Sequence, residues 1–78
     1  SLIDSFYATL ETAVEPKDLF IAYGRLVLAY MNGKAVSDTD IEKTHDPMTK
    51  KFGDAMLAYI RRQGVAYANG EYVKRALD

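Results

Sequence analysis

The stretch LFIAYGRLVLAYM, residues 19–31, decides the fold of this chain. Only Gly24 and Arg25 interrupt its apolar side chains, and Pro16 and Gly33 flank it. Proline suits the first turn of a helix, and glycine accepts the left-handed conformation that ends one. The pattern predicts a helix over residues 16–32 that is apolar nearly all round, and such a helix must be covered on most of its circumference. A glycine inside it is justified by a close approach of another backbone, so we expect Gly24 to face one.

Two amphipathic segments accompany this helix. Ser1 and Asp4 form a capping-box pattern ahead of a predicted helix over residues 2–14, and Ser37 and Asp40 form a second one ahead of a short acidic helix over residues 38–45. The apolar stripe of the first helix consists of Ile3, Phe6, Tyr7, Leu10 and Val14.

A long helix is predicted over residues 47–63, with Asp46 as its N-cap, Pro47 in its first turn and Gly64 ending or kinking it. One helical stripe, apolar except for Gln63, would consist of Met48, Phe52, Ala55, Met56, Tyr59, Gln63 and Ala66. Asn69 and Gly70 form another helix stop, and residues 71–77 could add a short terminal turn.

No stretch alternates apolar and polar residues over a period of two, so strands are not expected. The sequence predicts an all-α fold: a small bundle of three main helices plus one or two short ones, packed near-antiparallel. We expect one helical domain over residues 1–78, either a whole protein or a piece of a longer one.

Composition argues against several classes of function. The chain has no cysteine and one histidine, which excludes disulfides, thiolate metal sites and cysteine nucleophiles. We interpret His45 as the end of a helix, where a cation is favoured, and Asp46 as a cap. We therefore expect no enzyme activity, no cofactor and no metal.

The longest apolar run, residues 26–31, is too short to span a membrane, and a cytoplasmic location is expected.

Association is the function that the sequence favours. A chain of 78 residues buries only about 60% of its unfolded surface, and two flanking stripes do not cover a helix that is apolar on most sides. Residues 1–46 hold eight acids and four bases, a net charge of −4, whereas residues 47–78 hold three acids and six bases, a net charge of +3. This asymmetry suits an antiparallel pair of identical chains. We predict a homodimer or an adaptor for another protein, with apolar contacts through Leu28, Tyr30, Leu57 and Val65 and polar steering by Arg61 and Arg62.

The alternative is a nucleic-acid-binding accessory protein. On a helix over residues 47–63, the side chains of Lys50, Lys51, Arg61 and Arg62 would lie within about 120° of one another, opposite the apolar stripe. Such a face can contact phosphates. The net charge of −1 supplies no overall field that would attract nucleic acid.

Overall fold

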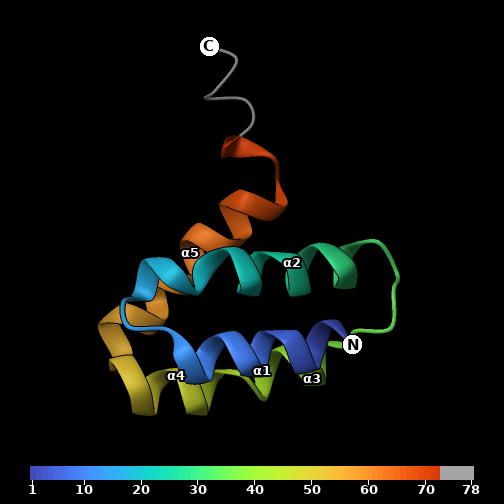
Figure 1. The fold of residues 1–78 in the computed structure, drawn as a ribbon. Helices are drawn as coiled ribbons and strands as arrows, with labels where there is room; N and C mark the ends of the chain where they lie inside the picture. The colour runs from blue at the N-terminus through green and yellow to red at the C-terminus, as the bar shows by residue number, and fades with distance from the viewer. Residues whose placement is uncertain (73–78) are drawn as a thin grey trace.

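The computed structural model describes residues 1–72, and no strand occurs among them, which confirms the all-α fold. In chain order the elements are α1 (Leu2–Thr12), the 3-10 helix η1 (Pro16–Asp18), α2 (Phe20–Met31), α3 (Asp38–Glu42), α4 (His45–Phe52) and α5 (Asp54–Ala68). Helices α1 and α2 run antiparallel, and α3 and α4 lie on the side of α1 away from α2 in the view of Figure 1. Helix α5 crosses behind α2, and its C-terminal end projects beyond it (Figure 1).

Three predicted helix ends are confirmed: the starts of α1 and α3 and the end of α2. The helix predicted over residues 16–32 is divided, because Pro16–Asp18 form η1 and α2 begins at Phe20. The helices predicted over residues 2–14 and 38–45 end earlier, at Thr12 and Glu42. The Ser1 hydroxyl accepts a hydrogen bond from the backbone N–H of Asp4 and so caps α1. Ser37 and Asp40 exchange the two bonds of a capping box at the start of α3. Helix α2 stops before Gly33, whose φ of +66° is one that glycine adopts at little cost. The terminal turn predicted over residues 71–77 extends beyond the described residues.

The continuous helix predicted over residues 47–63 is wrong. Gly53, with a φ of +88°, separates α4 from α5. Helix α5 then runs through Gly64 without ending there. A residue in the left-handed conformation interrupts the helical twist. The directions of the side chains after Gly53 therefore cannot be predicted by extending the helical period of the residues before it.

The break at Gly53 changes which residues of α5 form the core. Ile60, Gly64 and Ala68 are buried and Leu57 is half-buried, whereas Ala55 and Met56, assigned to the core stripe from the sequence, are exposed. The N-cap predicted at Asp46 is also wrong, because α4 begins at His45 and Asp46 lies inside its first turn.

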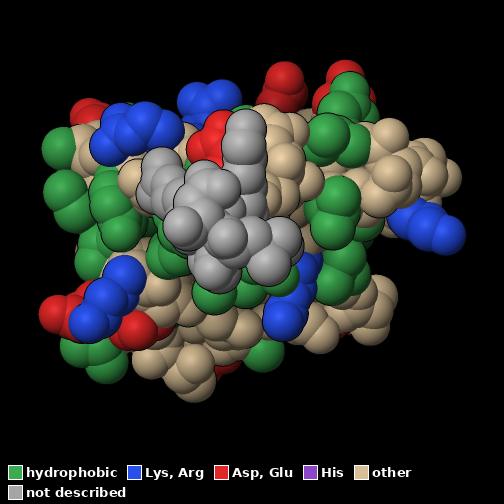
Figure 2. All heavy atoms as spheres, turned by 90° about the horizontal axis from the view of Figure 1, so that it is seen from above, with side chains coloured by type: hydrophobic (Ala, Val, Ile, Leu, Met, Phe, Trp, Pro, Cys, Tyr) green, Lys and Arg blue, Asp and Glu red, His purple; other side chains and the backbone are tan. Residues whose placement is uncertain are grey.

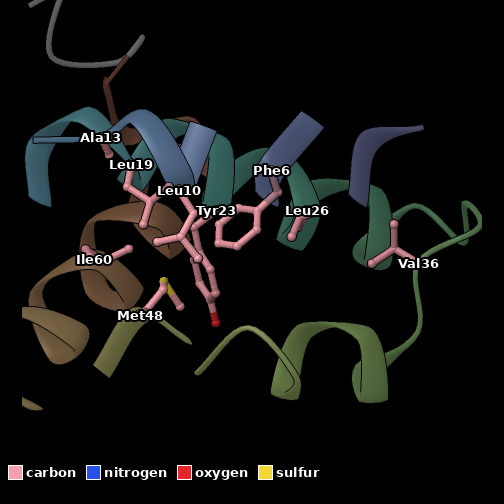
Figure 3. Packing of buried hydrophobic residues seen from close by; sticks show 9 residues of the cluster. All are labelled: Phe6, Leu10, Ala13, Leu19, Tyr23, Leu26, Val36, Met48 and Ile60. Atoms are coloured by element: carbon pink, nitrogen blue, oxygen red, sulfur yellow. The ribbon is translucent and has the colours of Figure 1, made fainter. Parts of the chain in front are cut away.

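The core joins all the main helices (Figure 3). Its buried members are Phe6, Leu10, Ala13, Leu19, Tyr23, Leu26, Val36, Met48 and Ile60. The aromatic rings of Phe6 and Tyr23 meet edge to face, with centroids 6.4 Å apart. Thr44 is the buried polar side chain of this region, and its hydroxyl donates to the carbonyl of Ile41 at 2.6 Å. Its hydrogen bond satisfies the hydroxyl, so burying it carries little cost.

Helices α2 and α5 meet backbone to backbone at two glycines. A Cβ atom on Gly24 would lie 2.7 Å from the carbonyl oxygen of Gly64, and a Cβ atom on Gly64 would lie 3.2 Å from the nitrogen of Gly24. Neither position can hold a methyl group unless the helices separate. The expectation that Gly24 faces another backbone is confirmed, and Gly64 supplies that backbone rather than a helix end.

We predict that Gly24→Ala destabilises the fold by about 1–3 kcal/mol, because the new methyl group would meet a carbonyl oxygen that cannot move independently of its helix. At an ordinary interior helix position the same substitution is stabilising by up to about 1 kcal/mol. Urea denaturation of the unaltered protein and of Gly24→Ala measures the difference in the free energy of unfolding. Ala58→Gly, at an exposed position of α5, is the control that reports helix propensity alone. A stabilised Gly24→Ala protein would show that the helices are not in contact there.

Candidate functional site

One protomer does not enclose the apolar segment of residues 19–31. Leu19, Tyr23 and Leu26 are buried, but other apolar side chains of α2 reach solvent. Their exposed fractions are 39% for Ile21, 38% for Leu28, 45% for Tyr30 and 54% for Met31. Scattered apolar side chains are common on protein surfaces, so what matters is whether these have apolar neighbours on other elements.

A hollow beside α5 brings together three of the predicted contact residues. It has a volume of about 470 Å³ and is open to solvent. Its lining consists of Tyr23, Arg61, Arg62, Val65, Ala66, Asn69 and Glu71. Val65 is 42% exposed, so the hollow combines an apolar wall with two guanidinium groups.

The glycine crossing places this hollow close to the uncovered part of α2. Leu28 follows Gly24 by one helical turn, and Val65 directly follows Gly64, so both exposed side chains lie within about a turn of the contact. We call the surface around this point the crossing face, formed by Leu28, Met31, Arg61, Arg62 and Val65. Figure 2, seen from above, shows hydrophobic side chains at the surface toward the left and the right of the view, with Lys and Arg side chains near them.

The two other predicted contact residues do not line the hollow. Tyr30 is exposed and lies on the same side of α2 as Tyr23, a lining residue seven positions before it. Leu57 is half-buried and packs against the core. Part of the Leu57 side chain is therefore covered within the protomer, and its role in an apolar contact stays a prediction.

Exposed charges on and near the crossing face have no ion-pair partners among residues 1–72. The ion pairs of this part of the chain join the N-terminal amine to Asp4 and Lys17 to Glu15. Arg61 and Arg62 are exposed and form none, and the same is true of Glu42 in α3. These groups remain available for contacts with another molecule.

Charges of both signs act on His45. Its Nε2 atom is 3.4 Å from the hydroxyl of Tyr23. Partial burial lowers the pKa of the imidazole and the nearby Arg61 guanidinium lowers it further, while Glu42 and Asp46 act in the opposite direction. The expectation that His45 ends a helix is wrong: it begins α4, where the helix dipole disfavours a cation.

The basic face proposed for nucleic acid is divided between two helices. Lys50 and Lys51 belong to α4, and Arg61 and Arg62 belong to α5, so the prediction of one continuous helical face is wrong. Lys51 Nζ donates hydrogen bonds to the carbonyl oxygens of Leu10 at 2.6 Å and Glu11 at 3.0 Å. These carbonyls lie at the end of α1, where a cation is favourable. Binding of nucleic acid stays a prediction.

No three acidic or histidine side chains among residues 1–72 gather closely enough to hold a metal ion. Helices with the length and apolar character needed to cross a bilayer are absent from the same range. Comparison with models of protein families, with curated proteins and with solved structures finds no match to this chain.

The lowered pKa of His45 predicts a pH dependence of stability. Because the folded protein holds the proton less tightly than the unfolded chain, the free energy of unfolding falls as the pH drops below the ordinary value of 6.5 and the imidazole becomes charged. Thermal unfolding between about pH 7 and pH 5 measures this effect, and His45→Gln should flatten the profile in that window. An NMR titration that places the His45 pKa at or above 6.5 would contradict this account.

The contacts of Lys51 predict a difference between neighbouring lysines. Lys51→Gln should reduce the free energy of unfolding by about 0.5–1.5 kcal/mol, because it shortens the side chain and removes the charge that contacts the end of α1. Lys50→Gln makes the same change in charge at an exposed site without such contacts and should cost less than about 0.5 kcal/mol. Equal effects in urea denaturation would argue against the Lys51 contacts.

Proposed function

We propose that this chain is a non-enzymatic protein–protein interaction domain that binds a second copy of itself through the crossing face. The observation that carries the proposal is the exposure of Leu28 and Met31 on the most apolar helix and of Val65 on α5, with Leu28 and Val65 each within about one helical turn of the contact between Gly24 and Gly64. Apolar side chains from two elements around one contact point form a surface that a partner can cover.

The protomer is large enough to support such a contact. Specific interfaces commonly bury about 800 Å² on each partner, which is roughly a sixth of the 5070 Å² that this protomer exposes. Apolar area contributes about 25 cal/mol per Å² that is removed from water, so a few hundred Å² around Leu28 and Val65 represent several kcal/mol. Part of this is lost to the entropy of association, which suits a reversible contact.

The distribution of charge favours a second copy as the partner. Residues 1–46 carry a net charge of −4 and residues 47–78 a net charge of +3. In a two-fold pair the same surface is used on both partners, so an acidic region of one copy can face a basic region of the other twice. In such a pair the acidic and basic regions of the two copies neutralise each other, so no third protein is needed to balance their charges.

Sedimentation across a concentration series tests this function. We expect the mass to rise from one chain of 8.7 kDa toward two as the concentration increases. Leu28→Glu and Val65→Glu should each shift the midpoint to higher concentration by about tenfold or more, because each places a charge in the apolar contact.

The control is Val14→Glu, which makes the same change at an apolar side chain that is 84% exposed but lies in the link between α1 and η1. It should leave the midpoint unchanged. A mass of one chain at every concentration of the unaltered protein would refute self-association.

A further inference from the structure

Helix α3 and the hollow beside α5 both lie next to His45. Tyr23 lines the hollow, and its hydroxyl is 3.4 Å from the Nε2 atom of His45, while α3 ends at Glu42, three residues before His45. The charges of Arg61 and Glu42 both act on the imidazole. We propose that the hollow lined by Arg61 and Arg62 binds the acidic helix α3 of a second copy. This inference rests on the proposed self-association and specifies how the two copies are oriented.

Helix α3 has two acidic side chains available for this contact. Asp38 and Glu42 are both exposed, and because they are four residues apart they lie on the same side of the helix. Asp40 is already engaged, because its carboxylate accepts the backbone N–H of Ser37 in the capping box. The carboxylate of Asp38 accepts only the neighbouring N–H of Thr39, and that of Glu42 accepts no hydrogen bond within residues 1–72.

The hollow has the chemistry that such a helix requires. Two guanidinium groups present planar sets of donors that match carboxylates, and the amide of Asn69 adds another donor. Val65 and Ala66 supply an apolar wall for the methylene groups of the incoming side chains. Glu71 is the acidic group among the lining residues, so the two arginines leave the hollow with a positive balance.

Two-fold symmetry makes this contact reciprocal. An axis that passes beside His45 places the hollow of each copy against α3 of the other, so the same pairing forms twice. Ion pairs at exposed sites contribute little affinity individually, and their main effects are on orientation and rejection of wrong arrangements. The crossing face would therefore supply the affinity and the charges would supply the geometry.

Charge reversal on the two sides tests the pairing. One variant carries Arg61→Glu and Arg62→Glu, and the other carries Asp38→Lys and Glu42→Lys. Each variant places like charges together in its own dimer, so each should self-associate at least about tenfold more weakly than the unaltered protein. An equimolar mixture should form a one-to-one heterodimer, because in the mixture every hollow again faces an α3 of opposite charge.

The control variant carries Lys34→Glu and Lys50→Glu, which changes the net charge as much as the arginine variant does but at exposed residues in the loop after α2 and on α4. Its dimer should be unaffected. Circular dichroism of each variant verifies helical content, and recovery of the heterodimer itself requires that both chains are folded.

The outcomes separate this inference from the proposed function. If both reversed variants self-associate as the unaltered protein does, the crossing face binds a second copy in another orientation and the pairing of α3 with the hollow is wrong. If the variants dissociate but the mixture does not recover a heterodimer, the pairing is again wrong. A monomeric unaltered protein would remove the proposed function and, with it, this inference.

Discussion

The backbone contact between Gly24 and Gly64 is the constraint on which the rest of the structure depends. Two helices that touch at their backbones can be brought together only where neither has a side chain, so this pair of glycines determines where α5 crosses α2. Below the crossing, Leu57 and Ile60 pack into the core. Beyond it, α5 projects past α2 (Figure 1), and Leu28 and Met31 of α2 and Val65 of α5 reach solvent. The contact that organises the core therefore also produces the surface that a single protomer leaves uncovered.

The start of α3 and the end of α2 were predictable from the sequence because each depends on a few neighbouring residues. Ser37 and Asp40 cap α3, and Gly33 ends α2, through bonds and angles that no distant element alters. The division at Gly53 was missed because the apolar residues on both sides were fitted to one continuous period. A signal was present: Leu57, Ile60 and Gly64 repeat at three and four residues on their own, in a phase that Phe52 does not share.

The residues around the hollow were predictable in part for the same reason. Arg61, Arg62 and Val65 are neighbours on one helix, and the structure places them around one hollow. Lys51 could not be assigned from the sequence, because its partners are carbonyls of α1 some forty residues away. The inward turn of Leu57 and the position of His45 beside Tyr23 likewise depend on tertiary packing.

The most direct test of this account is a methyl NMR spectrum recorded over a range of protein concentrations. If a second copy covers the crossing face, the methyl signals of Leu28 and Val65 shift together as the concentration rises, while those of the buried Leu26 and Ile60 stay in place. Signals of Leu28 and Val65 that remain constant up to the limit of solubility would contradict it.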